Sequence, residues 1–305
     1  MTSEAVQTTP SAGAVTLQRI RPPRTLWRDA LRRFRRNRLG MLGLVLVLLI
    51  VFTAIFADVL APYPYDKADF SKVLQLPFRD PKHILGGDEV GRDFLSRLIY
   101  GARTSLMVGL TVAIVGFTIG IPLGALAGYR GGKFDFIFLR VIEVMTAFPT
   151  LLFSIFLITI WGGGLEKVIL VLSISAWINV ARLCRAQFLS LREMDFIGAA
   201  RAIGASQMRI IFRHILPNAL APTLVVATFG VADAILIESA LSFLGFGVPP
   251  PTASWGELLS QSRSYIDFAW WLASFPGIAI FITVTIYNLV GEGIRDAIDP
   301  RLKET

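Results

Sequence analysis

Residues 41–60 read MLGLVLVLLIVFTAIFADVL, and Asp58 near the end is the only charged residue in the run. A helix of this length rises about 30 Å, which is the thickness of the hydrocarbon core of a bilayer. The run begins too far along the chain to be a signal peptide, and it has no small-residue cleavage site. We therefore expect a retained transmembrane helix here.

Further apolar runs follow, each long enough to suggest another span. They lie at about residues 106–127, 137–160, 168–183, 219–244 and 270–290. Backbone polar groups in lipid must be paired within the chain, so each run is expected to form a helix. The sequence predicts an all-α membrane protein with six transmembrane helices, of which the fourth is the shortest.

The composition excludes a soluble enzyme and a disordered chain. The 305 residues are 54% hydrophobic and 17% charged, whereas soluble domains carry about 25% charged residues. A disordered chain has low hydrophobicity and high charge, which is the opposite balance. One cysteine, Cys184, with His83 and His214, does not suffice for a disulfide framework or a typical zinc cluster. We expect no metal site.

The distribution of positive charge predicts the orientation. The net charge is +8, nine arginines lie within residues 19–38, and six more lie within 182–217. By the positive-inside rule both segments, and both termini, are expected in the cytoplasm. These arginines flank membrane spans instead of gathering on one folded surface, so we expect them to contact anionic lipid and not nucleic acid.

The longest cytoplasmic connection, residues 182–218, has apolar residues at helical spacing. Gly204 suits a left-handed helix end, and Ser206 can cap a second helix. Pro217 is expected to stop that helix, and Pro222 to lie in the first turn of the fifth span. The sequence predicts a helix–Gly–helix elbow, which either docks into a groove of a partner protein or rests on lipid.

Residues 198–200, Gly204 and residues 215–217 resemble the cytoplasmic EAA loop of ABC-importer permeases. Gly198 replaces the Glu of that motif, and His214 stands where its Ile falls. In that family the loop is a coupling helix, seated in a groove of the ATP-hydrolysing subunit. The residues to which the resemblance assigns coupling are Ala199, Ala200, Arg201, Gly204, Ala205, Ile215, Leu216 and Pro217.

Three further segments narrow the resemblance. Residues 86–93 (GGDEVGRD), 238–247 (ESALSFLGFG) and 288–301 (NLVGEGIRDAIDPR) are similar to segments of peptide-importer permeases. Over about residues 28–302 the chain looks like a C-type permease subunit of oligopeptide, dipeptide or nickel importers.

The resemblance implies the type I ABC-importer permease fold in the inner membrane of a bacterium or archaeon. It implies a heterodimer with a sister permease subunit, two ATP-binding subunits and an extracytoplasmic substrate-binding protein, which together import di- or oligopeptides. Nickel, glutathione or another solute is the alternative cargo. An ATPase-independent secondary transporter or a channel is the alternative class.

The chain itself is not expected to be an enzyme or to bind a cofactor. Its nearest match to a phosphate loop, residues 128–134, lacks the glycine spacing and ends in Phe134 where a Ser or Thr should bind Mg²⁺. By the resemblance, ATP and Mg²⁺ belong to the partner ATPase subunits.

Acids within the spans are costly and are candidates for the translocation path. Glu143 follows Arg140 by three residues, so an ion pair is the alternative there. Asp233 and Glu238 lie about 140° apart around a helix and cannot share a face. Pro149 is expected to bend the third span, and glycines of the second span to allow close helix contact. Those glycines are Gly109, Gly116, Gly120 and Gly124.

On the external side, Arg92, Asp93 and Arg97 are candidates for docking the binding protein. Residues 94–103 have the pattern of an amphipathic helix on the membrane surface. Aromatic residues are expected to form a belt at the outer interface. They are Trp255, Tyr265, Trp270 and Trp271.

These expectations divide the chain into consecutive parts. Residues 1–38 form an arginine-rich cytoplasmic tail, and residues 39–103 hold the first span, an external loop and the surface helix. Residues 104–293 form a five-helix core that includes the elbow at 193–217, and residues 294–305 form a second cytoplasmic tail.

Overall fold

The computed structural model describes residues 26–298. Expectations for residues 1–25 and 299–305, which include much of both predicted tails, lie outside the described residues. The secondary structure described is helical, apart from two isolated β-bridges in the loop 61–93. The predicted all-α class is confirmed.

Long helices make up most of the chain. They are α2 (Arg38–Ile55), α4 (Phe94–Arg130), α7 (Leu165–Arg192), α10 (Leu216–Phe243) and α12 (Trp271–Ile298). The shorter elements are α1 (Leu26–Phe34), α3 (Ala57–Leu60), the 3₁₀ turn η1 (Phe70–Lys72), α5 (Gly132–Thr146), α6 (Thr150–Trp161), α8 (Asp195–Ala202), α9 (Gln207–Arg209), the π-helix η2 (Ile210–Ile215) and α11 (Trp255–Ser262).

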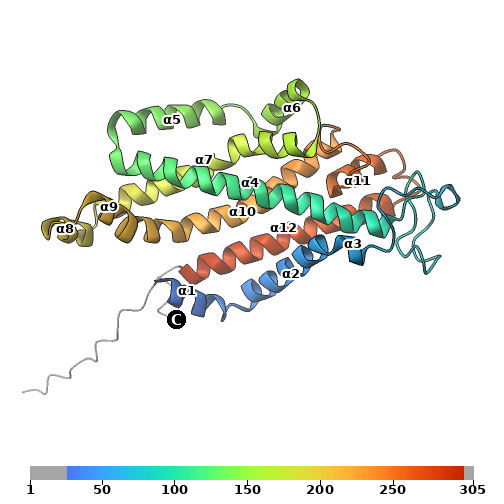
Figure 1. Cartoon of the computed structure of the whole chain (residues 1–305), viewed down its shortest axis with the longest axis horizontal. Coiled ribbons are helices and arrows are strands. Elements are labelled where there is room, and N and C mark those ends of the chain that lie inside the picture. The colour runs from blue at the N-terminus through green and yellow to red at the C-terminus, as the bar shows by residue number, and fades with distance from the viewer. Residues whose placement is uncertain (1–25, 299–305) are drawn as a thin grey trace, which may run out of the picture.

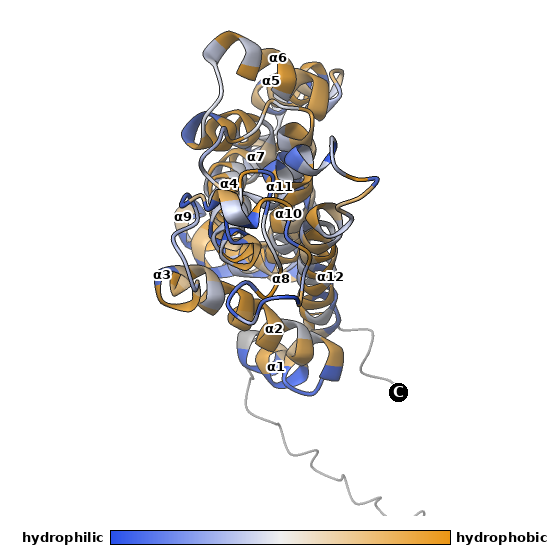
Figure 2. Ribbon diagram, turned by 90° about the vertical axis from the view of Figure 1, so that its right-hand side faces the viewer, coloured by the Kyte–Doolittle hydropathy of each residue, from blue (hydrophilic) through white to orange (hydrophobic). Residues whose placement is uncertain are grey.

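The long helices run side by side, with α5 and α6 as an outer layer over α4 and α7 (Figure 1). The elbow helices α8 and α9 lie at the end where α1 lies. The loop 61–93 and α11 lie at the opposite end, here called the outer end. Seen along the bundle, the helix ribbons are predominantly apolar (Figure 2), as expected where helix surfaces contact lipid.

Five of the described helices are long and apolar enough to cross a membrane. The prediction of six spans is met when α5 and α6 are counted as one span, because these two helices meet at an angle of 80°. Pro149 lies at the break, as N-cap of α6, and has the bending effect that the sequence predicts. The third span is thus broken and not straight.

Glycines let α4 pack closely on α7. Gly116, Gly120 and Gly124 repeat every four residues, and their backbones face α7. A Cβ on Gly124 would lie only 2.3 Å from the carbonyl oxygen of Ala181. Gly109 faces α10 instead, where a Cβ would meet Ile235 at 2.7 Å. The close helix contact expected from these glycines is present.

One expectation about the outer end is wrong. Residues 94–103 are the first turns of α4, which continues without a break to Arg130, and do not form a separate surface helix. Arg103, near this start, donates to the carbonyl oxygen of Ala54 at 2.8 Å and pairs with Asp58 at 2.8 Å. Its charge is therefore satisfied by the end of the first span and needs no lipid headgroup.

The expected aromatic belt is only partly present. Trp255 and Trp271 are 3% and 2% exposed, because α11 packs against α4, α10 and α12 and encloses both rings. The indole N–H of Trp255 donates to the carbonyl oxygen of Leu98 at 3.1 Å. Trp270, which is 54% exposed, fits the belt.

Candidate functional site

The elbow, residues 193–217, turns at Gly204, whose φ is +80°. The N–H of Ala205 donates to the carbonyl oxygen of Ala200 at 3.0 Å and closes the end of α8. The hydroxyl of Ser206 accepts from the N–H of Arg209 at 3.4 Å and caps α9. The predicted left-handed turn and serine cap are therefore both present.

Pro217 does not stop the second elbow helix, contrary to expectation. α9, η2 and α10 form one continuous helical segment, with Pro217 in the first turn of α10 and Pro222 inside it. The N–H of Leu216 donates to the carbonyl oxygen of Ile211, five residues back. This wider π turn accommodates a residue that has no N–H, so the chain stays helical.

One side of the elbow anchors it to the bundle. Ile197, Ile210 and Ile215 are at most 1% exposed, and they pack with Cys184 and Phe188 of α7. A displacement of the elbow must therefore move α7 as well as α10, with which the elbow is continuous.

The other side of the elbow is an open groove of about 430 Å³. It is lined by Phe196, Ala199, Ala200, Ile203, Ala205, Arg209, Arg213 and His214. Large apolar side chains remain uncovered nearby, with Ile203 86% exposed, Met208 63% and Phe212 59%. We call this surface the elbow groove.

The structure separates the residues that the resemblance assigns to coupling. Ala199, Ala200 and Ala205 line the elbow groove, and Gly204 forms its turn. Ile215 is buried against α7, while Leu216 and Pro217 begin α10 and do not line the groove. Arg201 is exposed on α8.

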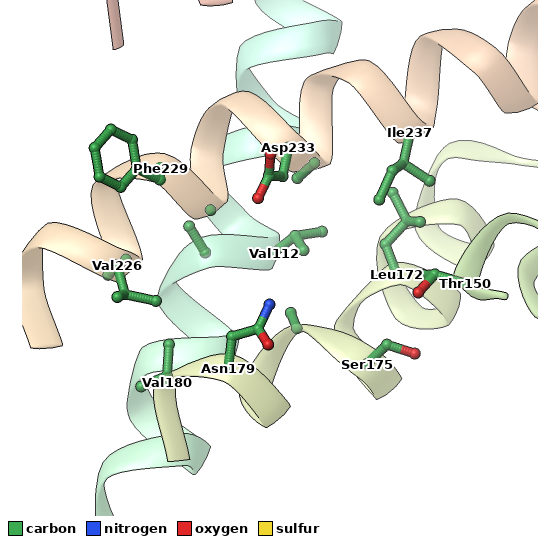
Figure 3. Close-up of a pocket in the computed structure, with 15 residues that line it drawn as sticks. Val112, Thr150, Leu172, Ser175, Asn179, Val180, Val226, Phe229, Asp233 and Ile237 are labelled. Atoms are coloured by element: carbon green, nitrogen blue, oxygen red, sulfur yellow. The ribbon is translucent and has the colours of Figure 1, made fainter. Parts of the chain in front are cut away.

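A second feature is a cavity of about 190 Å³ between α4, α6, α7 and α10. Its polar lining comes from Asp233, Asn179, Ser175 and Thr150. The carboxylate of Asp233 and the amide of Asn179 point into the same space from opposite helices (Figure 3). We call this space the central cavity, because it lies near the middle of α4, α7 and α10.

Glu238, the other acid of α10, has a different environment. It is fully buried and accepts hydrogen bonds from the hydroxyls of Ser242 at 2.7 Å and Ser254 at 2.8 Å, with Ser105 and Ser239 at 3.5 Å. These contacts tie α10 to α4 and to the segment before α11. As the sequence predicts, Glu238 and Asp233 do not share a face, and only Asp233 lines the central cavity.

The remaining two path candidates lie on the bent third span. Glu143 pairs with Arg140 on an exposed side of α5, so the predicted ion pair is present. Pro149 precedes Thr150, which lines the central cavity. Pro149 thus positions a wall of this cavity, whereas Glu143 does not line it.

At the outer end, Arg92, Asp93 and Arg97 are 7%, 3% and 0% exposed. Arg92 donates to Asp88 at 2.6 Å and to Glu89 at 2.9 Å. These residues hold the loop 61–93 in place and do not themselves present charge for docking.

Arg97 connects this loop to α11. Its guanidinium donates to Glu257 at 2.9 Å and lies 3.5 Å from Asp88. Burial raises the pKa of Glu257 to about 7, against the opposing effect of Arg97 and Arg92. Gln261 donates to Glu257 and completes the network. We call Asp88, Glu89, Arg92, Arg97, Glu257 and Gln261 the outer network.

Some of these residues were missed from the sequence. Asn179, Ser175 and Thr150 of the central cavity are single polar residues within apolar runs, and that isolation is the signal that could have drawn attention to them. Glu257 and Gln261 carry no such signal, because both lie in a mixed external loop.

Residues 120–304 match the family model described as "binding-protein-dependent transport system inner membrane component". Residues 25–77 match the model described as the N-terminal transmembrane domain of oligopeptide transport permease C.

Curated relatives match over nearly their whole length. The chain is 39% identical over 280 residues to the oligopeptide transport system permease protein OppC of Bacillus subtilis, covering 92% of this chain and 91% of that protein. It is 47% identical over 276 residues to a putative peptide transport system permease protein of Brucella abortus, covering 89% and 91%. It is 40% identical over 286 residues to the di/tripeptide transport system permease protein DppC of Pseudomonas aeruginosa, covering 92% and 93%.

Among solved structures, an inward-facing form of the MetNI methionine ABC transporter matches with a TM-score of 0.57 at 24% identity. The match covers 67% of this chain and 97% of that chain. At this identity the likeness concerns the fold alone, and it confirms the expected ABC-importer permease fold.

Proposed function

Because the chain belongs to the family of binding-protein-dependent transport system inner membrane components, we propose that it forms half of the translocation path of an ATP-driven peptide importer. As a member, it is a multi-pass inner-membrane permease subunit of an ABC importer. ATP hydrolysis in such importers belongs to a partner ATPase, and membership also implies a binding-protein partner.

We also propose which subunits surround this chain in the assembled importer. A sister permease supplies the second half of the path, two ATP-binding subunits attach to the cytoplasmic face, and the binding protein docks at the outer end. The central cavity supports a sister permease as the second half of the path. It is only partly enclosed by α4, α6, α7 and α10, and Asp233 in its lining remains exposed. The peptide cargo is supported by the names of the relatives from Bacillus, Brucella and Pseudomonas.

The observation that carries coupling is the exposed elbow groove. Ile203 is 86% exposed at the tip of the elbow, between helices whose opposite faces are fully buried. Burying one large apolar side chain is worth about 1.5–3 kcal/mol, so a complementary apolar partner gains from covering it. The arginines beside it, Arg209 and Arg213, favour a partner with acidic groups at its rim.

Cysteine cross-linking tests this assignment in the full chain in its own membrane. Cys184 is 1% exposed, so a single added cysteine dominates labelling. Ile203→Cys, coupled to a photoactivated thiol reagent, should cross-link to a protein that mass spectrometry identifies as an ATPase subunit. Val59→Cys is the matched control, because Val59 is 81% exposed at the outer end and should give no such product.

Lipid adducts alone at position 203 would end the coupling proposal. The family membership would stand, since it does not depend on the elbow groove.

A further inference from the structure

The central cavity holds a carboxylate without a partner. Asp233 forms no hydrogen bond and no ion pair with any residue in the 26–298 part of the chain, although it lies near the middle of a span. Two other acids within the spans have partners: Glu238 accepts hydrogen bonds from serine hydroxyls, and Asp135 forms an ion pair with Arg185. Of these three acids, Asp233 alone has no partner among the described residues.

An unpaired carboxylate at this depth is costly, and such residues face a water-filled cavity or a partner of opposite charge. Asp233 is exposed and lines the central cavity, together with the neutral polar groups of Asn179, Ser175 and Thr150. No lysine or arginine lines it. The electrostatics of the cavity therefore favour a mobile cation over an anion.

We propose that Asp233 pairs with the ammonium group of the cargo as it passes through the central cavity. This rests on the proposed function, because a peptide with a free N-terminus supplies such a group. The neighbouring lining fits this role: the amide oxygen of Asn179, which points into the same space as Asp233, can accept a further N–H bond of an ammonium. The hydroxyls of Ser175 and Thr150 add polar groups elsewhere on the lining. The apolar walls, formed by residues such as Val112 and Ile237, make the site tolerant of different side chains.

A second cavity continues the path toward the elbow end. It has a volume of about 350 Å³, is lined by Arg295, and shares Val226 and Phe229 with the central cavity. The ring of Phe229 packs on Gly291 of α12, where a Cβ would lie 2.6 Å away. Asp233 lines only the central cavity and Arg295 only this second one, so the two cavities offer one group of each sign to the two ends of an unblocked peptide.

The assembled importer, reconstituted in vesicles with its binding protein and ATP, provides the test. The probes are trialanine and N-acetyl-trialanine, each at a saturating concentration. Asp233→Asn should lower trialanine uptake about tenfold, as expected for loss of a charge-assisted interaction. It should leave the low N-acetyl-trialanine rate unchanged. The same binding protein is used throughout, so its own preference cancels when each variant is divided by wild type.

Two variants separate charge from packing. Asp233→Glu keeps the carboxylate and should restore trialanine uptake to within about threefold of wild type. Asp267→Asn removes an exposed acid in the external loop outside the central cavity and should leave both rates unchanged.

Equal losses for both probes in Asp233→Asn, or equal losses in Asp233→Glu and Asp233→Asn for trialanine, would overturn the role of Asp233. Equal losses for both probes would indicate that a basic residue of a neighbouring subunit pairs with Asp233. A wild-type importer that carries neither tripeptide would instead count against the proposed peptide cargo and not against the role of Asp233.

Discussion

The two ends of the molecule treat the same kinds of residue in opposite ways. At the outer end, Arg92 and Arg97 are buried and paired, and the aromatic rings of Phe94 and Trp255 lie in the core. At the elbow, arginines are exposed, and Ile203 is 86% exposed. The outer network satisfies its charges within the chain, whereas the elbow leaves its arginines and Ile203 uncovered. Charged groups that are paired and buried within the chain hold an element rigid, and those left uncovered are available to a partner.

The strongest challenge to this contrast is a matched pair of arginine substitutions. Arg97→Met leaves Glu257 buried without its directly paired cation, while Asp88 keeps Arg92, and it should destabilise the outer end by about 3–5 kcal/mol. Arg201→Met at the elbow removes an exposed charge and should change stability by less than about 0.5 kcal/mol. Thermal unfolding of the purified importer measures both. Similar losses in the two variants would show that the ends do not differ in this way.

A second test uses pH. The pKa of Glu257 rises from 4.5 to about 7 in the folded state, because burial disfavours the carboxylate. The folded protein therefore binds more protons than the unfolded chain between these values, and the stability of the outer end falls as pH rises from about 4.5 to about 7. One pKa unit corresponds to about 1.4 kcal/mol, so a shift of this size corresponds to an expected loss of about 3 kcal/mol.

Hydrogen exchange, corrected for its intrinsic pH dependence, should show this loss in α11 and not in the elbow. Glu257→Gln should abolish it, and a pH response that survives in this variant would assign it to another group such as Glu89.

The third test concerns the turn of the elbow. Gly204 has a φ of +80°, and a Cβ there would meet nothing within 4 Å, so a substitution adds backbone strain and no clash. Gly204→Val should cost about 1–2 kcal/mol locally and reduce substrate-stimulated ATP hydrolysis, with membrane insertion intact. Gly198→Val is the matched control, because Gly198 lies within α8 with open space around it. Equal strain in both variants would show that the left-handed turn is not the sensitive point.

The smallest expected effect is a gain. Gly198 stands where the family motif has Glu, and a Cβ there would meet nothing within 4 Å. Gly198→Glu adds a better helix former near the start of α8, where a negative charge is favourable, and should stabilise the elbow locally by about 0.5–1 kcal/mol. Slower hydrogen exchange in α8 would show it. Faster exchange would mean that the glycine is needed for the fold of the elbow.

The sequence predicted those features that depend on local pattern. The apolar runs located α2, α10 and α12, and the bend at Pro149 and the turn at Gly204 followed from backbone chemistry. These features need no knowledge of what packs against them.

Features that depend on distant contacts were missed. The continuity of α4 through residues 94–103 rests on acids supplied by the loop 61–93 and by α3, and the burial of Trp255 rests on where α11 packs. The central cavity brings Asn179 and Asp233 together from two helices, and spacing along one helix cannot reveal this. Pro217 was expected to stop the elbow helix, because a proline has no N–H to continue the helical hydrogen bonds. The π turn before it keeps the chain helical instead, and nothing in the local pattern indicates that turn.

That π turn has a consequence for the phase of the fifth span. The wide turn at 210–215 accommodates one more residue than an ordinary helical turn, and each residue of an α-helix advances the side chains by about 100°. Deleting a single residue between Ile210 and Ile215 would let this turn close to an ordinary α-helical turn, so α10 would keep its phase relative to the elbow. Inserting a residue there would instead rotate everything beyond it by about 100°, because the turn already holds the extra residue. Asp233 would then swing out of its cavity while α10 kept its length and hydropathy. The junction therefore tolerates the loss of one residue far better than the gain of one.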